Sequence, residues 1–211
     1  MDKQGIHEEQ YLEARQLMVQ LLKNMWERRL TNAAGGNLAV RVAEDRFLVT
    51  PTKAAEHYFC DLKPAELLLV DGSGRVLEGN AVPTKEMGMH LGVLQAFPTL
   101  TCTLHAHPFY AMPFIAASKA IPSLTEATAG RGDVQCIPVA PDDHYGAGSQ
   151  KLAASVLAYF LERKELVEQK SIGCILPGHG VVITGKTPYD AYSMLERIEA
   201  DAYCATMQKL I

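Results

Sequence analysis

The chain has 211 residues, of which 48% are hydrophobic and 21% are charged, with a formal net charge of −4. This length fits one domain, residues 1–211, and scattered Lys and Arg residues argue against nucleic-acid binding. No stretch approaches the roughly 18 apolar residues of a membrane span, and the acidic N-terminus lacks the apolar core of a signal peptide. Five widely spaced cysteines without a C-x-x-C pair favour a reducing compartment. We therefore expect a soluble cytoplasmic protein without a membrane or nucleic-acid partner.

The first third of the chain predicts one helix followed by hairpins. Apolar residues recur at spacings of three and four over 8–29, which indicates an amphipathic helix. Strands are expected at 38–42, 47–50, 67–70 and 75–77, with a turn signal between the last two. Tight turns join antiparallel strands, so we expect the sheet to be at least partly antiparallel.

A pair of glycines, Gly35 and Gly36, precedes Asn37 and the first strand. The pair can form a helix-to-strand turn, or a nest of backbone N–H groups that holds an anion while Asn37 adds a side-chain donor. The loop after the second strand carries hydroxyl groups and a cation, among them Thr52 and Lys53. The sequence leaves open whether either loop binds a ligand.

Residues 83–95 predict a helix that opens with Pro83 and Thr84. Glu86 falls in its expected first turn, where a carboxylate either interacts with the helix dipole or takes part in chemistry. His90 lies one turn later on the same face. We interpret His90 as a packing or supporting residue rather than a metal ligand.

The segment 101–107 predicts a strand that carries two histidines, His105 and His107. Alternate side chains of a strand share a face, and the alpha carbons of these two residues should lie about 6–7 Å apart. Two imidazoles at this spacing can converge on one ion at Zn–N distances of about 2.0–2.1 Å. The pair therefore indicates a metal site that needs a further ligand.

The second half of the chain alternates helices with short strands. His179 lies between two glycines at a tight corner between two buried strands, where another group can approach closely. The polar and aromatic loop at 142–146 is either a solvated turn or a substrate lid. The other expected elements are helices at 110–119, 149–161 and from 187 onward, an irregular segment at 122–135, and strands at 136–141, 173–176 and 181–184.

Together, His105, His107, His179 and Glu86 have the composition of a catalytic metal site. Three neutral nitrogen ligands leave one or two coordination positions for substrate oxygens. Nitrogen ligands favour Zn²⁺ or another divalent transition metal over magnesium and calcium. Spacing alone does not decide whether His179, which is distant in sequence, joins the other two.

Five separated motifs occur in a specific order along nearly the whole chain. They are Gly36-Asn37 with Val40-Arg41, Thr50-Pro51-Thr52, Pro83-Thr84-Lys85-Glu86, His105-Ala106-His107 and Gly178-His179-Gly180. With them the chain resembles the class II aldolase and adducin superfamily, which includes fuculose-phosphate aldolase. The resemblance implies an α/β fold with three layers, α/β/α, around a mainly antiparallel central sheet. It also implies a homotetramer with the site at a subunit contact.

The resemblance further implies that His105, His107 and His179 are zinc ligands and that Glu86 is the acid/base carboxylate. Aldolases of the family use Zn²⁺ to chelate the carbonyl and the neighbouring hydroxyl of a ketose phosphate. The carbon–carbon bond then breaks to give an aldehyde and a metal-bound enediolate, and the Glu protonates carbon. Epimerases of the superfamily carry Asp at this position, so Glu86 argues against epimerisation.

The resemblance also places the substrate phosphate against two loops and the segment before the Glu. The matching residues in this chain are Gly36, Asn37, Thr52 and Thr84. Two lysines depart from the family pattern, since Lys53 replaces a usual glycine and Lys85 replaces a usual hydroxyl residue. Either lysine would bind phosphate more strongly, bind a carboxylate, or lie on the surface without a ligand.

Lys85 before Glu86 matches the 3-oxo-tetronate-phosphate decarboxylases of the superfamily. Fuculose-phosphate aldolases also present a tyrosine from the neighbouring subunit to the aldehyde oxygen, and the corresponding region here holds none. Glu126, His144 or Tyr145 would have to substitute for it. Decarboxylation needs no such group, because CO₂ leaves and the enolate is protonated.

The sequence therefore gives three hypotheses for a chain with a small anionic substrate. The first is a zinc-dependent aldolase, an aldehyde-lyase, that cleaves a small ketose phosphate or related hydroxy-keto compound. The second is a carboxy-lyase that decarboxylates a 3-oxo acid by the same enolate chemistry. The third is a metal-free scaffold like adducin, against which the complete histidine triad and Glu86 argue.

Overall fold

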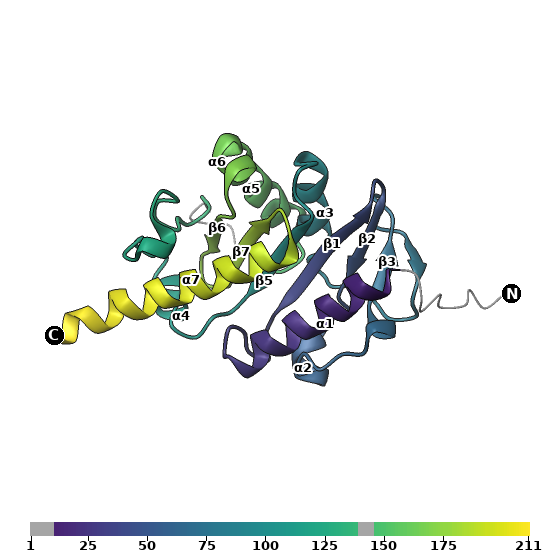
Figure 1. The fold of residues 1–211 in the computed structure, drawn as a ribbon, viewed down its shortest axis with the longest axis horizontal. Coiled ribbons are helices and arrows are strands. Elements are labelled where there is room, and N and C mark those ends of the chain that lie inside the picture. Colours follow the sequence, from purple (N-terminus) through teal and green to yellow (C-terminus); the bar gives the residue numbers. More distant parts are fainter. Residues whose placement is uncertain (1–10, 139–145) are drawn as a thin grey trace, which may run out of the picture.

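The computed structural model describes residues 11–138 and 146–211, which form a seven-stranded sheet with helices on both faces (Figure 1). The strand order is β4-β3-β2-β1-β5-β7-β6, and each pair of neighbouring strands is antiparallel. In chain order the elements are α1 (Leu12–Glu27), β1 (Asn37–Ala43), β2 (Arg46–Val49), α2 (Ala54–Tyr58), η1 (Pro64–Glu66), β3 (Leu68–Val70), β4 (Val76–Glu78), α3 (Met87–Ala96), β5 (Cys102–Ala106), α4 (Met112–Ala116), η2 (Glu126–Thr128), α5 (Gln150–Leu161), α6 (Lys164–Gln169), β6 (Gly173–Leu176), β7 (Gly180–Gly185), α7 (Pro188–Met207) and η3 (Gln208–Leu210). The expected three-layer α/β/α fold around an antiparallel sheet is confirmed.

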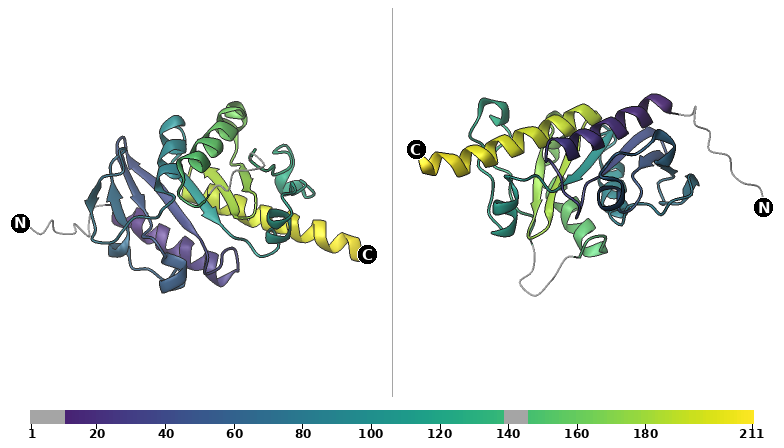
Figure 2. Two further views of the ribbon diagram at one scale, coloured as in Figure 1. Left: turned by 180° about the vertical axis from the view of Figure 1, so that it is seen from behind. Right: turned by 90° about the horizontal axis from the view of Figure 1, so that it is seen from below.

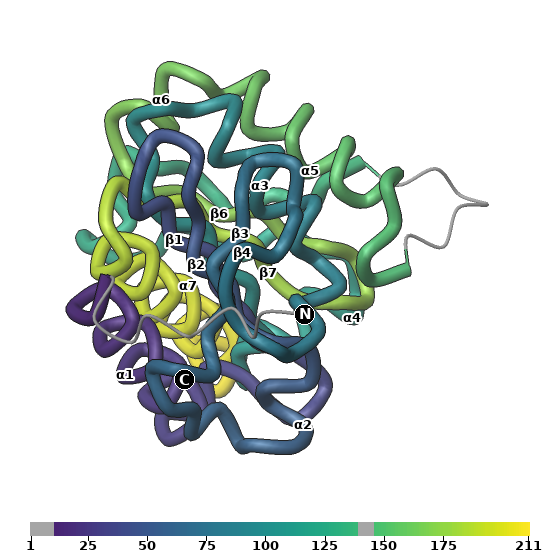
Figure 3. The backbone as a smooth tube through the Cα atoms, turned by 90° about the vertical axis from the view of Figure 1, so that its right-hand side faces the viewer, coloured from purple at the N-terminus to yellow at the C-terminus, as the bar shows by residue number. Residues whose placement is uncertain are grey.

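The two faces of the sheet carry separate hydrophobic cores, because successive strand side chains point in opposite directions. Leu38 and Val40 of β1 and Leu104 of β5 belong to the core beneath α1 and α7. Ala39 of β1 belongs to the core beneath α3 and α5. Figure 2 and Figure 3 show α1 and α7 together on one side of the sheet, and α3 with α5 on the other. By the same alternation, His105 of β5 faces α3.

The helix expected at 83–95 begins later than its sequence predicts, at Met87. The backbone N–H of Thr84 donates to the carbonyl of Thr50, and that of Thr52 donates to the carbonyl of Val82. This pairing keeps the preceding segment extended, so Glu86 occupies the N-cap and not the first turn. It also brings the loop at 50–52 beside the segment at 82–84, and both match family segments that bind phosphate.

Two other expectations differ from the structure. The strand expected at 136–141 is reduced to a single parallel bridge between Cys136 and Ile175, with residues 139–141 outside the described part of the chain. The helix expected at 110–119 is confined to α4. Among the described residues, none of the helices has the length and hydropathy needed to cross a bilayer.

Replacing Leu104 by alanine tests the core beneath α1 and α7. Leu104 is fully buried at the centre of the sheet, so Leu104→Ala should lower the free energy of unfolding by about 2–5 kcal/mol. Leu161, at the end of α5, is 47% exposed, and Leu161→Ala should change it by less than about 0.5 kcal/mol. Denaturant unfolding of both variants checks the difference, and equal losses would contradict the assignment of this core.

Candidate active site

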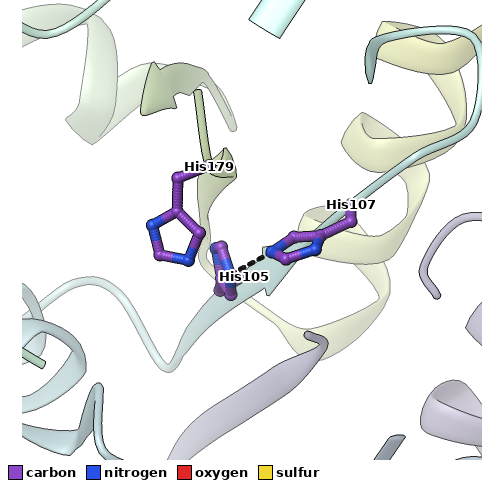
Figure 4. A group of neighbouring side chains, drawn as sticks. All are labelled: His105, His107 and His179. Atoms are coloured by element: carbon purple, nitrogen blue, oxygen red, sulfur yellow. Dashed lines mark hydrogen bonds between the residues drawn. The ribbon is translucent and has the colours of Figure 1, made fainter. Parts of the chain in front are cut away.

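Three histidines meet at one end of the paired strands β5 and β7 (Figure 4). His105 is the fourth residue of β5, His107 follows the end of this strand, and His179 lies in the turn between β6 and β7. Their candidate ligand nitrogens all lie within 4.8 Å of one another. The Nε2 atoms of His105 and His107 are 3.0 Å apart. The structure thus brings together the three histidines that the sequence singled out.

Hydrogen bonds to the far side of two rings fix the nitrogen that each ring presents. Nδ1–H of His105 donates to the carbonyl of Val181 at 3.0 Å. Nδ1–H of His107 donates to Oδ1 of Asn32 at 3.3 Å, and this oxygen also accepts the N–H of Ala34. Since these oxygens are acceptors, both Nε2 atoms keep their lone pairs and face each other.

Burial favours the neutral form of these two rings. It lowers the pKa of His105 well below its usual value and lowers the pKa of His107 to about 3, and the neighbouring histidines add to both effects. Neutral imidazoles are the form that binds metal ions. The rings are therefore prepared for ligation at neutral pH.

Glu86 lies beside the triad and is only 4% exposed. Its Oε2 accepts a hydrogen bond from Nδ2 of Asn37 at 2.9 Å and lies 3.3 Å from Nε2 of His105. Its Oε1 lies 3.7 Å from Nε2 of His179 and has no hydrogen-bond partner among the described residues. Nδ1 of His179 also lacks one.

A buried polar atom without a partner costs about 1–3 kcal/mol, so the two unpaired atoms indicate a group that these residues bind. Three imidazoles around one point, with a carboxylate at their side, are a ligand set that divalent transition metals prefer. The residues present therefore fit a metal ion.

Two glycines allow the imidazole rings to pack this closely. A Cβ atom at Gly35 would lie 2.5 Å from Cε1 and Nε2 of His107. A Cβ at Gly180 would lie 2.6 Å from Cδ2 of His107 and 2.7 Å from Cε1 of His105. Gly36 has a φ of +123°, which favours glycine. In the pair Gly35-Gly36, Gly36 thus allows the turn and Gly35 allows the close approach of His107.

A pocket of about 200 Å³ opens beside the triad. All six residues that the sequence assigned to substrate binding line it, together with Glu86, His105 and His179; the six are Gly36, Asn37, Thr52, Lys53, Thr84 and Lys85. Lys53 forms an ion pair with Glu56 at 3.4 Å, whereas Lys85 has no hydrogen bond or ion pair with another described residue. Lys85 is thus a cation at the pocket that the described residues leave without a counterion.

Residues 16–206 match the family described as Class II Aldolase and Adducin N-terminal domain. The chain belongs to this family. It is 32% identical over 197 residues to the 3-oxo-tetronate 4-phosphate decarboxylase of Haemophilus influenzae, covering 90% of this chain and 86% of that protein. It is 26% identical to the L-fuculose phosphate aldolase of Methanocaldococcus jannaschii, covering 92% of this chain and 96% of that protein.

Solved structures of the class II aldolase family share the fold. An L-fuculose 1-phosphate aldolase superimposes with a TM-score of 0.76 at 24% identity, covering 94% of this chain and 87% of that chain. The L-fuculose 1-phosphate aldolase of Thermus thermophilus superimposes with a TM-score of 0.72 at 22% identity, covering 93% of this chain and 95% of that chain. Aldolases and decarboxylases both break carbon–carbon bonds, so the relatives support a lyase.

Some site residues escaped the sequence interpretation. Asn32 bonds to His107, and Thr103 bonds to His90; neither was singled out. The alternation of β5 could have identified Thr103, which shares a face with His105, but nothing local marks Asn32. Among the suggested substitutes for the family tyrosine, Glu126 lies in η2 and does not line the pocket, while His144 and Tyr145 lie outside the described residues.

Gly35→Ala tests whether His107 must lie where it does. The added methyl group would displace the ring, so the affinity for Zn²⁺ should fall by about 10–100-fold. The control is Gly92→Ala in the middle of α3, where no atom lies within 4 Å of the added Cβ. It should leave the affinity unchanged and stabilise the fold by about 0.5–1 kcal/mol. Competition with a chelator measures both affinities, and wild-type affinity in Gly35→Ala would show that this ring position is not needed.

Proposed function

We propose that this chain is a metal-dependent carbon–carbon lyase, and that its reaction is the decarboxylation of a small phosphorylated 3-oxo acid. The observation that supports lyase chemistry is the carboxylate of Glu86, which lines the pocket, is buried beside three histidines and has one oxygen without a hydrogen-bond partner among the described residues. A metal ion held by His105, His107 and His179 would polarise the substrate carbonyl and stabilise negative charge on its oxygen. On the family resemblance we propose zinc as this metal.

The choice of decarboxylation rests on charge in the pocket. The glycine turn, the loop at 50–52 and the segment before Glu86 offer backbone and hydroxyl groups that suit one phosphate. Lys85 adds a positive charge beyond them, and a phosphorylated 3-oxo acid has a second anionic group, its carboxylate. A ketose phosphate has only one. The 32% identity to a 3-oxo-tetronate 4-phosphate decarboxylase supports the same choice.

The protein groups have separate tasks in this reaction. The bond between the carboxylate carbon and its neighbour breaks, CO₂ leaves, and the electron pair of the bond forms an enolate. Glu86 then donates a proton to the carbon that has lost CO₂ and regains a proton from water. Lys85 would bind and orient an anionic group of the substrate at the pocket.

Aldol cleavage, which the sequence interpretation placed first, is the second candidate. It is supported by relatives named as aldolases, including the one from Methanocaldococcus jannaschii. An aldolase needs a proton donor at the aldehyde oxygen in addition to Glu86. Among the described residues, the pocket offers only one other carboxylate, Glu56, and this group is exposed and paired with Lys53. This makes aldol cleavage the weaker proposal.

We also propose a homotetramer in the cytoplasm, on the family resemblance. An apolar groove of about 1040 Å³ borders His107, and aromatic side chains from two segments line it, among them Trp26, Phe109 and Tyr110. Phe109 is 55% exposed in the single chain. Burying such a surface against a second copy would be favourable, which supports a subunit contact beside the site.

Glu86→Gln separates the acid/base role from metal binding. The amide keeps the shape of the side chain but cannot deliver a proton, so kcat should fall by about 10²–10⁴-fold while the metal content stays at the wild-type level. Turnover of purified, zinc-loaded protein and elemental analysis measure the two quantities. Full activity in this variant would refute the proposed mechanism.

The products distinguish the two reactions. With a phosphorylated 3-oxo acid the protein should release CO₂, and with ketose 1-phosphates it should release no aldehyde. Lys85→Ala should raise KM for the acid by about tenfold, because a charged contact is lost, whereas Lys186→Ala, remote from the pocket, should leave KM unchanged. Aldehyde release without CO₂ would establish aldol cleavage instead.

A further inference from the structure

A row of buried polar side chains continues from Glu86 into the layer between the sheet and α3. Nδ2 of Asn37 donates to Oε2 of Glu86 at 2.9 Å. Oδ1 of Asn37 lies 2.5 Å from Nε2 of His90, and Nδ1 of His90 lies 2.8 Å from Oγ1 of Thr103. His90 and Thr103 are fully buried and Asn37 is 8% exposed. Such a buried polar row is costly unless every member is hydrogen-bonded, and here every member is.

The direction of these bonds follows from the carboxylate at the end of the row. A carboxyl oxygen without a proton can only accept, and Asn37 presents its amide nitrogen to Oε2 of Glu86. The amide oxygen of Asn37 then faces His90 and requires a donor, which is Nε2–H. Burial lowers the pKa of His90 to about 4, so at neutral pH its ring carries a single N–H.

The last bond completes the direction. With its proton on Nε2, His90 has a lone pair on Nδ1, and the hydroxyl of Thr103 donates to it. Every donor in the row therefore points toward Glu86. The reverse direction would place Oδ1 of Asn37 against Oε2 of Glu86, which is repulsive unless this carboxyl oxygen carries a proton.

We propose that His90 is a positioning residue for Glu86 and acts through the amide of Asn37. This proposal rests on the proposed function, in which Glu86 transfers the proton. The hydrogen-bonded row holds Oε2 as an acceptor. It leaves Oε1, which has no hydrogen-bond partner among the described residues and belongs to a pocket-lining side chain, as the oxygen at which the proton is exchanged.

The sequence positions of the row explain why these residues share one structure. His90 lies one turn after Glu86 on α3, so the helix sets their separation. Asn37 and His105 are paired across β1 and β5, and Thr103 lies on the same face of β5. The strand pairing that presents His105 to the pocket therefore also places the two partners of His90.

The tautomer of His90 is the direct test, and it does not depend on turnover. In zinc-loaded protein labelled with ¹⁵N-histidine, through-bond correlation spectra assign the ring nitrogens without any variant. The expected result is a proton on Nε2 of His90 and none on Nδ1. A proton on Nδ1 would reverse the row and overturn the proposal. This result stands even where the protein releases neither CO₂ nor aldehyde, an outcome that would sink only the proposed function.

Kinetics of two matched variants supply the second test. In His90→Leu no donor reaches Asn37, so kcat should fall by about 10–100-fold while KM and zinc content remain as in the wild type. In His90→Gln the side-chain amide can again donate to Asn37, and most of the lost kcat should return. Equal losses in both variants, or a loss of zinc in place of kcat, would mean that His90 only fills space.

If His90→Leu does not fold, Thr103→Val provides the same kinetic test. Valine has the shape of threonine but lacks the hydroxyl that donates to Nδ1 of His90. The ring then loses the partner that selects its tautomer, and kcat should fall severalfold at unchanged KM and zinc content. An unaltered kcat together with an unaltered His90 tautomer would remove Thr103 from the row and contradict the direction proposed for it.

Discussion

The site depends on the register of β5, the strand that lies between β1 and β7 at the centre of the sheet. Pairing with β1 sets Asn37 opposite His105, and pairing with β7 sets Val182 opposite the same residue. A slip of one residue would turn every side chain of β5 to the other face. His105 would then enter the apolar core beneath α1 and α7, where it would lose both Glu86 and the carbonyl of Val181. The hydrophobic packing of Leu104 therefore secures the position of the histidine next to it.

A second constraint is that the site gathers polar groups in a place from which water is largely excluded. Three of the rings bond through one nitrogen to a neighbouring group: His105 to a carbonyl, His107 to a side-chain amide oxygen and His90 to a hydroxyl. These bonds fix which nitrogen faces inward. Oε1 of Glu86 and Nδ1 of His179 have no such partner among the described residues. A bound ligand would supply the hydrogen-bond or metal partner that the folded chain does not give to Oε1 of Glu86.

The common chemistry of the family follows from the triad and Glu86, whereas the choice of substrate depends on residues around them. Aldol cleavage and decarboxylation both pass through an enolate beside a polarised carbonyl, so one ligand set can serve both. Lys85 lines the pocket next to Glu86, the residue to which we assign the proton transfer. Variation at such positions lets related folds act on different hydroxy-keto compounds without altering the buried machinery.

Local periodicity determined much of this protein. Alternation in 101–107 placed His105 and Thr103 on one face, and helical spacing placed His90 one turn after Glu86. Other features needed the folded chain: hydrogen bonds between the loops at 50–52 and 82–84 delayed the start of α3, and the pairing of β5 with β7 brought His179 to the other histidines. Helix and strand repeats are short-range properties of a sequence, but the partner of a buried hydrogen-bonding group is set by segments that meet only when the sheet forms. For that reason the sequence singled out the histidines and the carboxylate that come together, and only the tertiary structure decided which groups hold them in place.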